Sequence, residues 1–146
     1  MEEKVNSGTK AINSFKFKKF EIVQDHCTMK VNTDGVLLGA WTDPAECADI
    51  LDIGTGTGVI ALMMAQKAPD AAIVGIEIDE ASSREAESNV DNSIFKGKVK
   101  IINQSIQDFT SLHTHQFDLI ISNPPFFTGG TFSANENKAN VRHTIK

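Results

Sequence analysis

The chain has 146 residues, of which 40% are hydrophobic, and this is enough for one domain with a buried core. Its formal net charge of -5 excludes binding of a long duplex through bulk electrostatics, and two cysteines without metal-ligand spacing exclude a disulfide framework or zinc site. Because no apolar run is long enough to cross a membrane and the polar start resembles no signal peptide, we expect a cytoplasmic protein without membrane or metal partners.

The N-terminal region is expected to begin with a disordered stretch, 1–13, followed by a single domain at 14–146. Apolar and polar residues alternate over 15–31, which predicts a β-hairpin outside the main sheet with its turn at 25–28. Lysines gather in this region, at Lys10, Lys16, Lys18, Lys19 and Lys30. Steering of a polyanion and solvation of a strand edge both explain these lysines, and the sequence leaves the two open.

A helix and a strand lead into the centre of the chain. The segment from Asn32 to Gly35 has the composition of a helix cap and predicts a short helix over 36–41. The apolar run at 50–53, interrupted only by Asp52, indicates a strand that is buried on both faces of a parallel sheet. Three glycines follow this strand and alternate with threonines, at Gly54, Gly56 and Gly58.

The glycines predict a nucleotide site. Without a Cβ, the turn can take positive φ angles and leaves its main chain open to a ligand, and a helix over 59–67 points its first amides at the turn. Gly56, Gly58 and Ala61 also fit the Gly-x-Gly-x-x-Ala pattern of dinucleotide sites, so the pattern alone is ambiguous. Asp52 before the glycines resembles the S-adenosylmethionine loop of class I methyltransferases, since a carboxylate suits a cationic amine better than a diphosphate.

An acidic residue ends the next predicted strand, over 72–78. In doubly wound sheets an acid in the position of Glu77 holds the vicinal ribose hydroxyls with its two oxygens, and a solvated strand-end carboxylate is the alternative. Asp79 is a natural N-cap for a helix that runs to about residue 92. The acids that we expect on the exposed face of this helix are Glu80, Glu85 and Glu87.

An acid beside an aromatic residue follows a third predicted strand, over 98–103. Residues 105–109 are predicted as a loop or single turn, in which Asp108 accepts the amino hydrogen of adenine and Phe109 covers the ring. A helix cap at Asp108 is the alternative.

The segment Asn123-Pro124-Pro125-Phe126 directly follows a fourth apolar strand, over 117–122. Two prolines remove two amide donors, so the Asn123 side-chain oxygen and the Pro124 carbonyl present acceptors only. Acceptors that form hydrogen bonds with both N–H groups of a conjugated amine would help to localise its lone pair on nitrogen, directed at a methyl donor. Alignment and electrostatics would then contribute most of the catalysis. Phe126 offers a flat face for a base, and a proline-terminated strand with a core phenylalanine is the competing interpretation.

These motifs are similar to those of the class I amino-group methyltransferases, which act on adenine N6, cytosine N4 or glutamine amide nitrogen. Three further segments, at 15–20, 29–41 and 141–144, resemble the bacterial valine-tRNA (adenine-37-N6)-methyltransferases. The resemblance implies S-adenosylmethionine as cofactor and a tRNA anticodon-loop adenine as substrate. It implies that the methionine end of the cofactor is bordered by Lys30, Thr33, Asp34 and Gly35, and that the substrate side includes Pro125, Phe127, Arg142 and His143.

The predicted fold is α/β, with the first four parallel strands of a Rossmann-like methyltransferase sheet and an N-terminal β-hairpin. Members of the family resembled here continue with further strands, so we expect a truncated chain whose fourth strand is an open edge and mediates self-association. A release-factor type protein-glutamine methyltransferase and a cofactor-binding fragment without turnover are the alternative functions.

Overall fold

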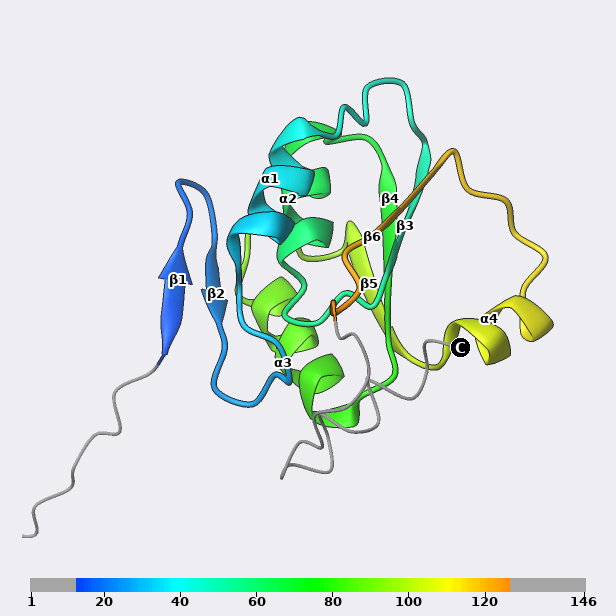
Figure 1. Ribbon diagram of the computed structural model, residues 1–146. Helices are drawn as coiled ribbons and strands as arrows, with labels where there is room; N and C mark the ends of the chain where they lie inside the picture. Colours follow the sequence, from blue (N-terminus) through cyan, green and yellow to red (C-terminus); the bar gives the residue numbers. More distant parts are fainter. Residues whose placement is uncertain (1–12, 127–146) are drawn as a thin grey trace, which may run out of the picture.

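The computed structural model describes residues 13–126, which form a parallel sheet, helices on both of its faces and a separate antiparallel hairpin (Figure 1). The hairpin consists of β1 (Ser14–Lys16) and β2 (Glu21–Val23). The other elements are α1 (Thr33–Trp41), β3 (Asp49–Ile53), α2 (Val59–Lys67), β4 (Ala72–Glu77), α3 (Glu80–Asp91), β5 (Val99–Asn103), α4 (Ile106–Leu112) and β6 (Leu119–Ser122). The predicted fold class is confirmed, because the sheet order is β5-β4-β3-β6 with every pair parallel.

The register of the sheet decides which loops meet at its carboxyl edge. Ile53 at the end of β3 pairs with Ile76 of β4 on one side and with Ser122 of β6 on the other. The residues that follow these strands therefore emerge side by side, as expected for a doubly wound sheet. This places the glycine turn after β3 directly beside Asn123 after β6.

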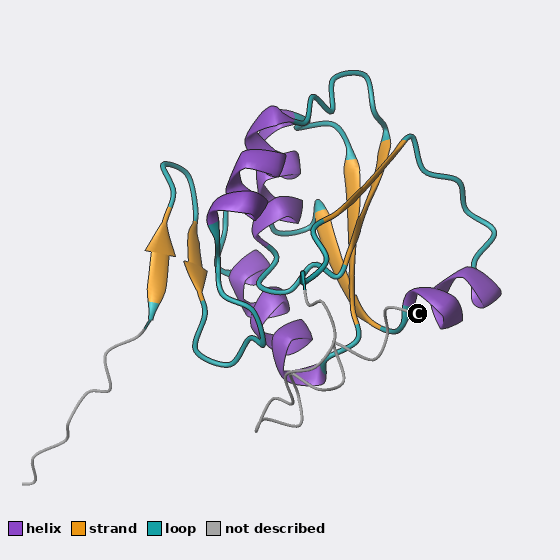
Figure 2. Ribbon diagram, in the orientation of Figure 1, coloured by secondary structure: helices purple, strands orange, loops and turns teal. Residues whose placement is uncertain are grey.

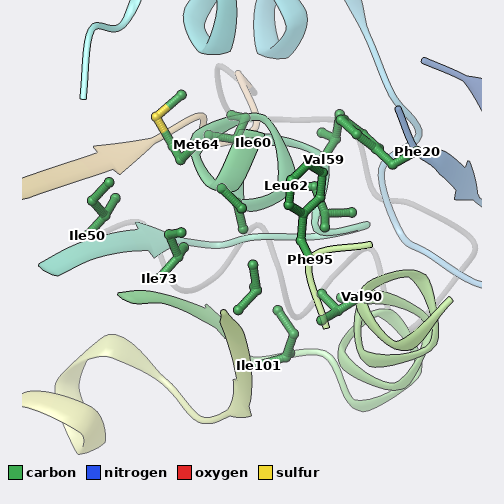
Figure 3. Packing of buried hydrophobic residues seen from close by; sticks show 14 of the residues in the cluster. Phe20, Ile50, Val59, Ile60, Leu62, Met64, Ile73, Val90, Phe95 and Ile101 are labelled. Carbon is green, nitrogen blue, oxygen red and sulfur yellow. The ribbon is translucent and has the colours of Figure 1, made fainter. Parts of the chain in front are cut away.

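Helices cover the two faces of the sheet unequally, with α1, α2 and α3 on one side and α4 on the other (Figure 2). The larger core packs β-strand residues such as Ile50 and Ile73 against Leu62 and Met64 of α2 (Figure 3). The alternate residues of the same strands face α4 and form a smaller core with Phe109. Since each fully buried side chain of this size contributes roughly 1.5 to 3 kcal/mol, the core holds the carboxyl edge rigidly.

The hairpin is shorter than the sequence predicted. It turns between Phe17 and Phe20, whose amide and carbonyl form a 2.9 Å hydrogen bond, and not at 25–28. Residues 25–28 instead run along α3, because the amides of Asp25, His26 and Cys27 donate to the Glu85 carboxylate and not to a second strand. The hairpin still lies outside the main sheet, as predicted.

Two expectations for the helices were wrong. Glu85 is only 7% exposed and does not lie on the solvent face of α3. Residues 105–109 are not a loop, since Ser105 caps α4 by accepting a hydrogen bond from the Asp108 amide. The cap at Asp79 was predicted correctly, and the predicted cap segment 32–35 contains the N-cap Asn32, although α1 begins at Thr33 and not at residue 36. Each of the two side chains accepts an amide of the first helical turn.

The β6 strand is at an edge of the sheet, and within 13–126 no strand pairs with its outer side. Ile120 in the middle of this strand leaves 58% of its surface exposed. An edge with free amides, free carbonyls and an apolar side chain is a template for pairing with another strand.

We predict that the chain self-associates through β6 and that Ile120→Lys reduces this association, because the charge opposes close approach of a second edge. Sedimentation velocity over a range of concentrations measures the effect. Ile94→Lys is the matched control, since Ile94 is 72% exposed and lies outside the sheet. A wild-type chain that stays monomeric at every concentration would contradict the prediction.

Candidate active site

The glycine turn leaves its main chain bare at the carboxyl end of β3. Gly54 and Gly56 have φ angles of 68° and 57°, in the left-handed region that favours glycine. No atom lies within 4 Å of where a Cβ would stand on either residue, so the space beside the turn is open. The amides of Gly54 and Thr55 donate to the Ile76 carbonyl at 2.8 and 2.9 Å, which ties the turn to β4.

Asp52 lies beneath the turn and not beside the ligand space. It is 1% exposed, its Oδ2 accepts a 2.7 Å hydrogen bond from the Thr55 hydroxyl, and its Oδ1 has no partner among the described residues. Burial raises the pKa of Asp52 to about 7. The side chain supports the turn and lines neither of the two cavities described below, and its contact with a cationic amine stays a prediction.

Glu77 connects the turn to the end of β4. One carboxylate oxygen accepts the Gly56 amide at 2.8 Å, and the other accepts the Asp79 amide at 3.0 Å. The side chain is 6% exposed and lines the cavity described next. Burial raises its pKa, although both amides favour the charged form.

A cavity lies at the carboxyl edge of the sheet, and a smaller one adjoins it. The residues of the main cavity that bear on function are Gly54, Gly56, Glu77, Gln104, Asn123, Pro124 and Pro125. The smaller cavity is bordered by Lys30 and Gly35, and it shares Gly54, Gly56 and Asn123 with the main one. The glycine turn and the start of the Asn-Pro-Pro-Phe segment thus face the same space.

Asn123 approaches the start of α1 closely. A Cβ on Gly35 would stand 3.0 Å from the Asn123 side-chain nitrogen, so a larger residue there would require this amide to shift by a few tenths of an ångström. The Gly35 amide donates to the capping oxygen of Asn32 at 2.9 Å. Phe126 is 79% exposed, which leaves its ring free to stack on a partner.

Several residues of the predicted site lie elsewhere. Thr33 and Asp34 are exposed in the first turn of α1 and line neither cavity. Phe127, Arg142 and His143 lie outside the described residues.

Asp108 and Phe109 both lie on α4, and neither is among the residues that line the cavity. The Asp108 carboxylate accepts the Ser105 hydroxyl at 2.7 Å in a capping interaction. The Phe109 ring is 5% exposed and packs in the core with Leu51 and Ile76. Asp108 thus acts in the helix cap and Phe109 in the core, and the adenine contacts of this pair stay a prediction.

Gln104 is the cavity residue that sequence reasoning missed. It directly follows β5, and its side-chain oxygen is buried with no hydrogen-bond partner in the part of the chain that the structure describes. A buried acceptor without a partner costs about 1 to 3 kcal/mol, so a ligand donor there would be favourable. Its position after the third strand of the sheet was the only sequence signal.

Within 13–126 no group of three or more His, Cys, Asp or Glu side chains is placed to hold a metal ion. No helix of that region is both long and apolar enough to cross a membrane.

The parallel sheet, the bare glycine turn and the acid that ends β4 define the class I methyltransferase fold. The structure of P. horikoshii TYW2 in complex with MeSAdo shares this fold, with a TM-score of 0.55 and 16% identity over 67% of this chain and 38% of that one. The chain belongs to the methyltransferase small domain family, whose model matches residues 27–144.

Two curated relatives carry the name tRNA1(Val) (adenine(37)-N6)-methyltransferase. The protein from Pedobacter heparinus is 48% identical over 132 residues, which are 90% of this chain and 56% of the relative. The protein from Trichodesmium erythraeum is 48% identical over 134 residues, again 90% of this chain and 56% of the relative. The chain thus spans little more than half the length of these relatives.

The buried Asp52 carboxyl predicts a pH-dependent stability. Its pKa is about 7 in the folded chain and near the ordinary 3.8 when unfolded, so between these values the folded state holds an extra proton. The free energy of unfolding should therefore decrease as the pH rises from about 4 to about 7. Urea unfolding at several pH values should show that the free energy of unfolding decreases less with rising pH in Asp52→Asn than in the wild type. An equal slope in both proteins would contradict this assignment.

Proposed function

We propose that this chain binds S-adenosylmethionine and takes part in methyl transfer to N6 of an adenine in tRNA, with adenine 37 of valine tRNA as the specific target. The observation that carries the proposal is that the glycine turn and the acceptors at Asn123 and Pro124 face one cavity. The names of the relatives at 48% identity support the substrate. An unpaired anticodon-loop base needs little energy to be extruded, which suits a site that must enclose the base.

The residues at the cavity fit the parts of this cofactor. The bare main chain at Gly54 and Gly56 allows close approach, and Glu77 has acceptor oxygens for the ribose hydroxyls. Gln104 offers its unpaired oxygen to the amino group of adenine, the role that the sequence assigned to Asp108. Lys30 and Gly35 border the smaller cavity, where the methionine end would lie.

The reaction needs a nucleophilic amine, and the chain supplies acceptors that prepare one. The Asn123 side-chain oxygen and the Pro124 carbonyl each accept a hydrogen bond from one N–H group of the adenine amino group. These two hydrogen bonds reduce the conjugation of the nitrogen lone pair with the ring. When bound, S-adenosylmethionine would supply an electrophilic methyl group: the new N–C bond would form as the S–C bond breaks, the neutral thioether would leave, and the methylated amine would release one proton to solvent. The exposed Phe126 ring stacks on the base, worth about 1 to 3 kcal/mol, and fixes its orientation.

Two alternative functions would use part of the same site. A glutamine amide also carries two N–H bonds, so a protein-glutamine methyltransferase of the release-factor type would use the same acceptors. A chain that binds cofactor without turnover would keep only the glycine-turn side. Methyl-acceptor assays with total tRNA and with purified release factor separate the substrates, and the relatives' names favour tRNA.

Asn123→Ala should abolish methyl transfer to tRNA and leave the dissociation constant for S-adenosylhomocysteine nearly unchanged, because it removes an acceptor for the substrate amine. Radiolabelled methyl incorporation and calorimetry measure the two effects. The matched control is Asn92→Ala, since Asn92 is an exposed residue at the end of α3. Loss of cofactor binding together with transfer would contradict the division of roles.

Gln104→Ala should weaken binding of S-adenosylhomocysteine by up to about tenfold, the equivalent of one net hydrogen bond. Gln107→Ala is the matched control, because Gln107 is exposed on α4. Asp108→Ala should leave the affinity unchanged. If only the Asp108 variant lost affinity for S-adenosylhomocysteine, the adenine contact would belong to Asp108, as the sequence predicted, and not to Gln104.

A further inference from the structure

A backbone strap, defined as residues 24–31, connects the hairpin to α1 and forms one wall of both cavities. Thr28 and Met29 line the main cavity, and Met29, Lys30 and Val31 line the smaller one opposite the glycine turn. The strap contains neither helix nor strand, and it passes along α3 between β2 and α1 (Figure 1). Its position must therefore be set by contacts with other parts of the chain.

Glu85 of α3 accepts three of the hydrogen bonds that the strap donates. Its Oε2 accepts the amides of Asp25 and His26, each at 2.8 Å, and its Oε1 accepts the amide of Cys27 at 2.9 Å. The next amide, of Thr28, donates to the Ser82 hydroxyl at 3.0 Å, one turn earlier on the same face of α3. Four successive strap amides are thus bound by two side chains of one helix.

Asn89, one turn later on the same face, links the end of β2, directly before the strap, to the glycine turn. Its side-chain oxygen accepts the Val23 amide at 2.9 Å. Its side-chain nitrogen donates to the Val23 carbonyl and to the Thr57 carbonyl, both at 2.9 Å. The buried polar face of α3 therefore holds both walls of the cofactor space in a fixed relation.

We propose that Glu85 is a positioning residue for the cofactor, and that its carboxylate holds the strap against the ligand space. The proposal rests on the proposed function for the identity of that ligand. Asp25 and His26 are exposed, so burial of apolar surface contributes little to holding this part of the strap. Charge-assisted hydrogen bonds are about twice as strong as neutral ones, so the carboxylate dominates.

The Cys27 thiol is a close neighbour of the Glu85 carboxylate. Burial and the nearby charge of Glu85 raise the pKa of the Cys27 thiol to about 12, so this neighbour stays neutral and adds no repulsion. The carboxylate and the amides that it accepts are separated by 58 to 60 residues of chain. Glu85 therefore couples two distant segments and does not stabilise its own helix.

The test compares Glu85→Ala with Glu87→Ala in the full chain, since Glu87 lies exposed on the same helix. Glu85→Ala should weaken S-adenosylhomocysteine binding by about tenfold or more, as expected for loss of charged hydrogen bonds, and should speed hydrogen exchange at residues 25–28. Added formate should restore part of the affinity, because a small carboxylate can occupy the vacated position. Glu87→Ala should bind as the wild type does.

A lower melting temperature with unchanged affinity and unchanged exchange at 25–28 would overturn the proposal, because it would show a purely structural role. If the alanine variant does not fold, Glu85→Gln preserves the size of the side chain and should show the same loss in smaller degree, since its amide nitrogen cannot accept the strap amides. A Glu85→Gln protein with wild-type affinity would overturn it as well. If the wild-type chain does not bind S-adenosylhomocysteine, that result would contradict the proposed function instead. Hydrogen exchange at residues 25–28 would still test whether Glu85 holds the strap.

Discussion

The parallel pairing of β3 with β6 is the constraint on which the site depends. Because Ile53 and Ser122 are partners in register, the chain leaves the sheet at neighbouring points and brings the glycine turn beside Asn123. A register shift of one residue would turn the side chains of β6 to the opposite face. The cores on both sides of the sheet hold that register, so hydrophobic packing far from the chemistry fixes where donor and acceptor groups meet.

Buried carboxylates organise the backbone around this point. Glu77 accepts amides from the glycine turn and from the start of the following segment, and Glu85 accepts amides from the strap. Asp52 differs, because it accepts a side-chain hydroxyl, that of Thr55, and burial raises its pKa to about 7. The acids of this chain thus do more than give it a negative charge, since three buried ones, Asp52, Glu77 and Glu85, hold the backbone segments that form the cavity walls.

The sequence predicted the parts of the fold that local pattern controls. Apolar runs identified all four strands of the sheet, and the side chain of Asp79 identified the start of α3, because caps and strand burial leave short-range signals. Contacts between distant segments left no such signal. The exposed position predicted for Glu85 failed because a strap some sixty residues away covers it, and Asp108 was misplaced because the length of α4 could not be judged from Ser105 alone.

The central claim is that one pocket holds a methyl donor against the main chain of Gly54 and Gly56 and an acceptor amine against Asn123 and Pro124. A crystal structure of the chain with S-adenosylhomocysteine tests it most directly. The account predicts the homocysteine sulfur between the glycine turn and Asn123, with the ribose at Glu77 and the adenine at Gln104. A ligand bound elsewhere, or one whose sulfur faces away from Asn123, would contradict it.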